Sequence, residues 1–198
     1  LLTGNRLPLL STGLPVALAV IAVLQPVVAS RAILFELGPV QVSRAIYGRN
    51  PFPESIEIAR YIRERTGQAD RVAVVGSEPQ IYFYAGRRSA TGHIYTYPLM
   101  ELHRYALAMQ REMIREIEGA NPKYLVFVSA PRSWLPKPQS DMTIFHWFEA
   151  YQRGFIRVGV VDLLPGREPV YAWDDEAARY TPRSDIWLAV YERRRSGR

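Results

Sequence analysis

Apolar and polar positions divide the chain into one long uncharged run and a region of short alternating segments. Residues 7–30 contain no charged side chain, and Arg6 and Arg31 flank this run. A helix of 24 residues would be roughly 36 Å long, against about 30 Å for the hydrocarbon core of a bilayer. The run therefore predicts a transmembrane helix, with the two flanking arginines in contact with lipid headgroups.

Three other interpretations fit the uncharged run less well. A cleaved signal peptide would have a shorter apolar stretch and a more basic start, although residues 28–30 (VAS) resemble a weak cleavage site. A buried helix of a water-facing domain rarely continues this far without a charge, and a helix lying in the membrane interface would carry a basic face. The transmembrane interpretation is therefore preferred.

Beyond the run, helix-like and strand-like spacings alternate. Helical apolar spacing is found in residues 54–66, 79–84, 99–118 and 143–153, and strand-like runs in residues 71–76, 124–128, 155–164, 170–173 and 186–192. This alternation predicts an α/β fold: one N-terminal transmembrane helix followed by a three-layer, mainly parallel-sheet (Rossmann-like) soluble domain whose last strands form an antiparallel edge. The expected parts are a membrane helix with its flanks (1–31), a connector (32–53), the α/β domain (54–192) and a basic tail (193–198).

Charge and composition narrow the classes of site. The net charge is +6, from 25 basic and 19 acidic residues, and nearly all of the basic residues are arginines. The chain has no cysteine, which excludes disulfides, thiolate metal sites and cysteine nucleophiles but does not fix the compartment. More arginines follow the apolar run than precede it, so the positive-inside rule alone would place the domain in the cytoplasm. Large domains often cross the membrane regardless of this rule.

The turn after the first predicted strand is one candidate ligand site. Ser77 and Glu78 follow that strand, and in open α/β sheets ligands bind beyond the carboxyl ends of the strands. The turn has neither the glycine pattern of a dinucleotide site nor the lysine of a P-loop. A helix cap by Ser77 or Glu78 is therefore the preferred interpretation of these two residues.

A second candidate mixes cations with aromatic rings. Arg87 and Arg88 lie near Tyr82, Tyr95 and Tyr97 in the sequence. Such a mixture can stack on bases or sugars, or can form a contact with a partner protein, in which tyrosine and arginine are enriched. It also occurs at the edge of an ordinary core, with the arginines in solvent.

No set of residues predicts catalysis, a cofactor or a metal. The three histidines, His93, His103 and His146, have no metal-ligand spacing, and the acidic residues 174–176 are typical of a solvated turn. No Ser/His/Asp set is identifiable. The arginines of the tail suit anionic lipid or an acidic partner, and with a membrane helix in the same chain we expect no nucleic acid.

Several segments resemble a known family. Residues 50–55 (NPFPES), 58–63 (IARYIR), 70–72 (DRV), 76–82 (GSEPQIY), 87–91 (RRSAT) and 95–100 (YTYPLM) are similar to the C-terminal region of bacterial glycosyltransferase family 39 membrane proteins. That family is similar to dolichyl-phosphate-mannose–protein mannosyltransferases. The resemblance covers roughly residues 5–130. It implies a last membrane helix leading into an extracytoplasmic domain, hence a periplasmic domain on a bacterial inner membrane.

The resemblance also shows what the chain does not contain. The catalytic acidic residue of the family lies in an early loop between membrane helices, upstream of this region, so the chain should not transfer sugar alone. Its start at Leu1 rather than at Met predicts either a segment of a longer polypeptide or a partly identified polypeptide. Two functions remain. The first is a non-catalytic, single-span accessory subunit that packs on other subunits of a membrane complex, for example of respiration or photosynthesis. The second is the terminal domain of a lipid-linked-sugar glycosyltransferase.

Overall fold

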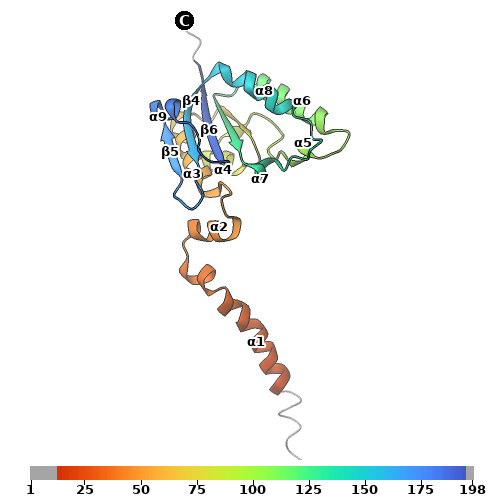
Figure 1. The fold of residues 1–198 in the computed structure, drawn as a ribbon, viewed down its shortest axis with the longest axis vertical. Helices are drawn as coiled ribbons and strands as arrows, with labels where there is room; N and C mark the ends of the chain where they lie inside the picture. Colours follow the sequence, from red (N-terminus) through yellow and green to blue (C-terminus); the bar gives the residue numbers. More distant parts are fainter. Residues whose placement is uncertain (1–12, 195–198) are drawn as a thin grey trace, which may run out of the picture. The chain divides into compact units, whose positions relative to one another are not determined.

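The computed structural model of the chain describes residues 13–194 and divides into two compact units at Gly48 and Arg49 (Figure 1). The first unit is helical and the second is a mixed α/β structure. The predicted domain boundaries remain predictions, since this division is by compactness alone.

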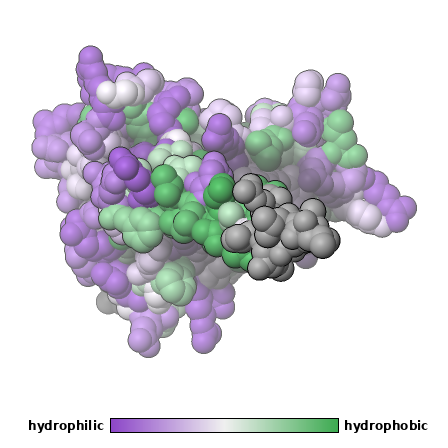
Figure 2. Space-filling view, turned by 90° about the horizontal axis from the view of Figure 1, so that it is seen from below, coloured by the Kyte–Doolittle hydropathy of each residue, from purple (hydrophilic) through white to green (hydrophobic). Residues whose placement is uncertain are grey.

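In its described part, residues 13–48, the first unit consists of three successive helical segments: α1 (Leu14–Ala29), the π-helical turn η2 (Ala32–Glu36) and α2 (Pro39–Tyr47). Prolines lie in the first turns of α1 and α2, where the missing N–H costs nothing. Gly48 ends α2 with a φ of 61°, a conformation that glycine adopts without strain. The apolar side chains of α1 are exposed, and Figure 2 shows this surface in green.

The predicted transmembrane helix is wrong for the described residues. Between residues 13 and 194, no helix combines the length and the apolar character needed to cross a membrane. Helix α1 has 16 residues, about 24 Å, and a π-helical turn follows it after Ser30 and Arg31. The single-pass topology and the inner-membrane location with a periplasmic domain rested on that span, and both are withdrawn with it.

The second unit alternates helices and strands along the chain. Its helices are α3 (Phe52–Arg65), α4 (Gln80–Ala85), α5 (Tyr97–Met100), α6 (Ala106–Ala120), α7 (Pro131–Trp134), α8 (Thr143–Tyr151), the short η3 (Gln152–Gly154) and α9 (Asp175–Arg179). Its strands are β1 (Arg71–Val75), β2 (Arg88–Ser89), β3 (Tyr124–Ser129), β4 (Phe155–Asp162), β5 (Val170–Trp173) and β6 (Trp187–Arg193).

These strands form one six-stranded sheet in the order β2-β1-β3-β6-β4-β5. Strands β2, β1 and β3 are parallel, whereas β6 is antiparallel to both β3 and β4, and β5 is antiparallel to β4. The prediction of a mainly parallel sheet is therefore wrong, because the sheet is mixed. The last strand of the chain enters the middle of the sheet, and a buried strand has the same apolar run whichever way it points.

Both faces of the sheet are covered, because successive residues of a strand point to opposite faces. Val72 and Val74 of β1 face the core formed with α3 and α4, which contains Ile58, Ile62 and Ile81. Ala73 and Val75 face the opposite core, formed with α6 and α8, which contains Met113, Ile117 and Phe148. Figure 1 shows α6 and α8 on one side of the strands and α3 and α4 on the other.

One predicted helix is divided in two. The apolar spacing of residues 99–118 predicts a single helix, but α5 ends at Met100 and α6 begins at Ala106. The buried side chain of Gln110 donates to the carbonyl oxygens of Leu99 and Asp141 and accepts from the backbone N–H of Ile144, at 2.8–2.9 Å. This amide fixes the end of α5 and the start of α8 against α6.

Candidate functional site

The sheet has a topological switch point beside β1. The chain leaves β1 for β2 through α4 on one face, and it returns to β3, on the other side of β1, through α6 on the opposite face. At such a point the connections that follow two neighbouring strands leave in opposite directions. Open α/β sheets bind ligands in the crevice at the carboxyl ends of these two strands. In this chain the carboxyl ends are those of β1 and β3, followed by residues 76–78 and 130–134.

Four buried polar side chains meet at these carboxyl ends: Ser77, Glu78, Thr96 and Ser133, which we call the switch-point network. The Ser133 hydroxyl donates to Glu78 Oε2 and accepts from the Ser77 N–H, both at 2.8 Å. The Thr96 N–H donates to Ser77 Oγ at 2.9 Å. The network thus joins the turn after β1, the start of α5 and the short helix α7.

The direction of each hydrogen bond in the network can be assigned. Thr96 Oγ1 donates its single proton to the carbonyl oxygen of Ser133 at 2.9 Å. The 2.8 Å contact between Ser77 Oγ and Thr96 Oγ1 therefore has Ser77 as its donor. Every hydroxyl of the network has both a donor and an acceptor role filled by another protein group.

Glu78 is the only carboxyl group of this network. Its side chain is 4% exposed. Burial raises the pKa of Glu78 to about 7, against the lowering effect of hydrogen bonds from Ser133 and Ser77. The site is also close-packed: a Cβ atom at Gly76 would lie 2.7 Å from Glu78 Oε2 and 2.7 Å from Val128 Cβ. Glycine is therefore required before Ser77.

The prediction that Ser77 or Glu78 caps the following helix is wrong. Pro79 occupies the N-cap of α4, and no side chain bonds to the first turn of this helix. The side chain of Ser77 instead bonds to Thr96, 19 residues away, and that of Glu78 to Ser133 of α7, 55 residues away. Such long-range partners cannot be recognised from local sequence patterns.

Tyr95 and Tyr97 flank the switch-point network. Their rings pack edge to face with centroids 4.4 Å apart, and the Tyr97 hydroxyl donates to the carbonyl oxygen of Arg132 at 2.7 Å. Partial burial and the neighbouring Tyr95 raise the pKa of Tyr97 to about 12. Of the predicted contact residues, Ser77, Glu78, Tyr95 and Tyr97 thus belong to this end of β1.

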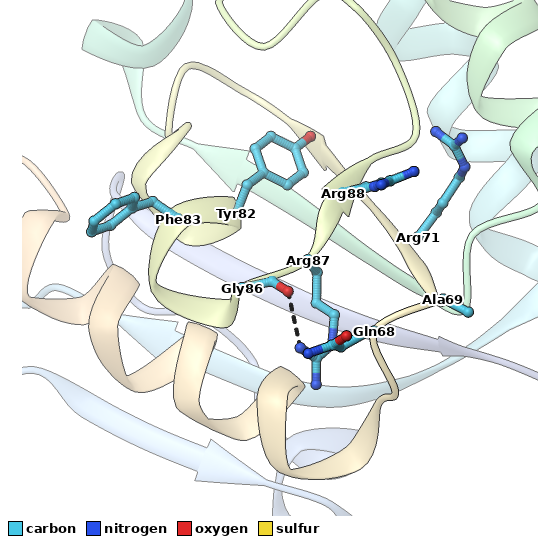
Figure 3. Close-up of a pocket in the computed structure, with 8 residues that line it drawn as sticks. All are labelled: Gln68, Ala69, Arg71, Tyr82, Phe83, Gly86, Arg87 and Arg88. Carbon is cyan, nitrogen blue, oxygen red and sulfur yellow. Dashed lines mark hydrogen bonds between the residues drawn. The ribbon is translucent and has the colours of Figure 1, made fainter.

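The other predicted contact residues, Tyr82, Arg87 and Arg88, lie at the amino end of β1. They line a cavity of about 610 Å³ together with Arg71 and Phe83 (Figure 3). Helix α4 runs back from the carboxyl end of β1, so β2 starts beside Arg71. The structure therefore separates the predicted site residues into two groups, one at each end of the strand.

Tyr82 completes the edge of the sheet. Its hydroxyl accepts a hydrogen bond from the backbone N–H of Val74 at 2.8 Å. The paired part of β2 contains only two residues, opposite Arg71 and Val72, so the Tyr82 hydroxyl replaces the strand neighbour of Val74. Burial raises the pKa of this hydroxyl to about 12, so it stays protonated at neutral pH.

Arg87 joins the ends of two helices. Its guanidinium donates to the carbonyl oxygens of Arg63, Ala85, Gly86 and Thr66 and to the Thr66 hydroxyl, at 2.5–3.1 Å. The last carbonyls of a helix have no partner within the helix, and a cation there is favourable. Arg87 therefore stabilises the carboxyl ends of α3 and α4.

Arg71 and Arg88 differ from Arg87, because both of their side chains are exposed. They are register partners on the parallel strands β1 and β2. Arg71 was missed as a site residue in the sequence, where it is simply the first residue of a buried strand. Only the register of β2 brings it beside Arg88.

The two predicted headgroup contacts have different outcomes. Arg6 lies outside the described residues. Arg31 forms an ion pair with Glu36, with Nε and Oε1 3.4 Å apart, between exposed side chains. Its contact with lipid remains a prediction. Over residues 13–194, no three His, Asp or Glu side chains gather as a metal site would require.

Comparisons with protein-family models, with curated proteins and with solved structures found no match. The resemblance to glycosyltransferase family 39 therefore remains a hypothesis that rests on the residues quoted for it.

Proposed function

We propose that the chain is a non-catalytic accessory subunit of a larger protein assembly. Helix α1 is its attachment segment, and the α/β unit from Arg49 onward packs on partner subunits. The observation that carries this proposal is the surface of α1, on which apolar side chains are exposed on all sides. Ile21 and Val23, on opposite sides of the helix, are 61% and 68% exposed.

An apolar helix without a polar face is unfavourable in water. Each Val, Leu or Ile side chain that becomes fully buried contributes about 1.5–3 kcal/mol. An ordinary surface helix needs only one apolar stripe, whereas α1 carries no charged residue over its 16 positions. We therefore expect several apolar surfaces of partner subunits, rather than a single groove, to surround α1.

The switch-point network supports a non-catalytic role. Its hydroxyls and its carboxylate bond to one another, with donor and acceptor distances of 2.8–2.9 Å. A catalytic base or nucleophile needs a hydrogen-bonding position directed at a substrate. The hydroxyls of this network are instead all bonded within it, and these bonds fix three chain segments in place.

The proposal is tested by substituting α1 in the full chain and purifying the native assembly. We expect Ile21→Arg to release the chain from its partners, because a charge on α1 cannot be surrounded by apolar side chains. The matched control is Leu102→Arg, an equally exposed position (61%) between α5 and α6. Retention of the same partners by Ile21→Arg would contradict attachment through α1.

The terminal domain of a longer lipid-linked-sugar glycosyltransferase is the second candidate. One observation favours it: the segments that carry the resemblance, residues 50–100, form consecutive elements from α3 to α5, and the apolar helix α1 precedes them in the chain, with η2 and α2 between. This is the order of parts that the resemblance implies. The mass of the natural polypeptide under denaturing conditions separates the two candidates, since the transferase would be several times larger than 22.6 kDa.

A further inference from the structure

The cavity at the amino ends of β1 and β2 has a strongly basic lining. Three of its eight lining residues are arginines and none is acidic: Gln68, Ala69, Arg71, Tyr82, Phe83, Gly86, Arg87 and Arg88. Its volume of about 610 Å³ is within the usual range for small-molecule sites, about 300–1,000 Å³.

Two of the arginines stand directly opposite each other. Arg71 and Arg88 are register partners, so their backbones are about 4.8 Å apart. The Arg71 guanidinium reaches across to β2 and donates to the carbonyl oxygen of Ser89 at 2.9 Å. Figure 3 shows the guanidinium groups of Arg71 and Arg88 extending to the same side of the strands.

This pair has no counter-ion in the part of the chain that the structure describes. The ion pairs found there involve other cations, namely Arg31, Arg49, Arg60, Arg65, His93 and Lys123. Two like charges directly opposite each other on neighbouring strands are unfavourable. An anion placed between them would turn this repulsion into two attractions.

The surroundings hold the pair in place before any ligand arrives. Arg87 is turned the other way, toward Gln68, and its bonds to backbone carbonyls fix the turn that leads into Arg88 (Figure 3). The Tyr82 hydroxyl, bonded to the Val74 N–H, fixes α4 against the same strand. A site whose backbone is already ordered loses less entropy on binding.

We propose that Arg71 and Arg88 bind the phosphate group of a small phosphomonoester. A guanidinium presents a planar fork of N–H donors that matches two oxygens of a phosphate, and a phosphate has three terminal oxygens and nearly two negative charges. It can therefore bridge two neighbouring forks. A carboxylate, with one charge and two oxygens, is satisfied by a single arginine. The remaining cavity volume accommodates the group to which the phosphate is esterified.

The test is a calorimetric titration of the full chain with glycerol 3-phosphate, and with glycerol and inorganic phosphate as separate probes. We expect saturable binding of glycerol 3-phosphate, none of glycerol, and inorganic phosphate binding at the same site. Arg88→Gln and Arg71→Gln should each weaken binding of glycerol 3-phosphate at least tenfold, because each removes charge-assisted hydrogen bonds to the phosphate.

The matched control is Arg111→Gln, which removes the same charge from an exposed position of α6. It should leave the affinity for glycerol 3-phosphate within about twofold, the range expected for screened charges at a distance. Equal weakening by Arg111→Gln would mean nonspecific attraction and would overturn the proposal. Binding of inorganic phosphate without binding of glycerol 3-phosphate would also overturn it, because the cavity would then exclude the ester. The result is independent of attachment through α1.

Discussion

The two ends of β1 hold polar side chains in opposite ways. At the carboxyl end, Ser77, Glu78 and Ser133 are buried and bonded to one another. At the amino end, Arg71 and Arg88 are exposed, side by side and without a carboxylate partner among residues 13–194. Buried polar groups that bond to one another specify a structure, whereas like charges held together without a counter-ion are available to a ligand. Position at a switch point is therefore not sufficient evidence for a ligand site.

The largest expected effect is at the close-packed carboxyl end. Gly76→Ala should destabilise the fold by about 3 kcal/mol, because the new Cβ would meet Glu78 Oε2 and Val128 at 2.7 Å. Gly119→Ala is the matched control, since a Cβ there meets no atom within 4 Å and alanine is the better helix former. Chemical denaturation of both variants measures the difference. A small effect of Gly76→Ala would show that this end is loosely packed.

Glu78 should make stability depend on pH. The folded chain keeps the Glu78 proton up to about pH 7, whereas the unfolded chain loses it near pH 4.5. The contribution of the bound Glu78 proton to stability is therefore complete below about pH 4.5 and is lost as the pH rises through 7, a change of about 3 kcal/mol. The measurement is the free energy of unfolding of wild type and Glu78→Gln between pH 4 and 8. Parallel curves would contradict the raised pKa.

Removal of a single hydroxyl should open the switch-point network. Ser133→Ala leaves the Ser77 N–H and Glu78 Oε2 without their 2.8 Å partner, which should cost about 1.5 kcal/mol. Denaturant unfolding measures this cost, and Ser133→Thr, which keeps the hydroxyl, should recover part of it. If Ser133→Ala were as stable as wild type, the network would not be a structural feature.

The smallest effects on stability should come from the amino end. Arg71→Gln and Arg88→Gln should each change the free energy of unfolding by less than about 0.5 kcal/mol, because both side chains are exposed and repel each other. Differential scanning calorimetry without added phosphate checks this. A large loss of stability would assign these arginines a structural role like that of Arg87.

The sequence predicted most elements but not their arrangement. Strands β1 and β3 and helices α3 and α4 lie within one or two residues of the predicted ranges, because their apolar period or β-branched runs are local signals. The place of β6 between β3 and β4 depends on long-range pairing, which has no local signal. The predicted membrane span is wrong for the described part of the run, because an uncharged run sets only the greatest possible length of a helix; residues 7–12 lie outside the described residues, and α1 covers 16 of the others.

The candidate sites were predictable only in part. Ser77, Glu78, Arg87 and Arg88 could be singled out, since they follow a strand or stand beside aromatic residues. Their partners Thr96 and Ser133 come from irregular segments with no recognisable motif, and Arg71 acquires its meaning only from the register with β2. Local patterns therefore indicated the positions, and tertiary contacts decided their roles.

The most direct test of the proposed function is native mass spectrometry of the chain after gentle purification from its natural source. An accessory subunit attached through α1 should be released from a complex as a chain near 22.6 kDa, together with stoichiometric partners that Ile21→Arg loses and Leu102→Arg keeps. A chain near 22.6 kDa that is always alone, with α1 intact, would contradict the account.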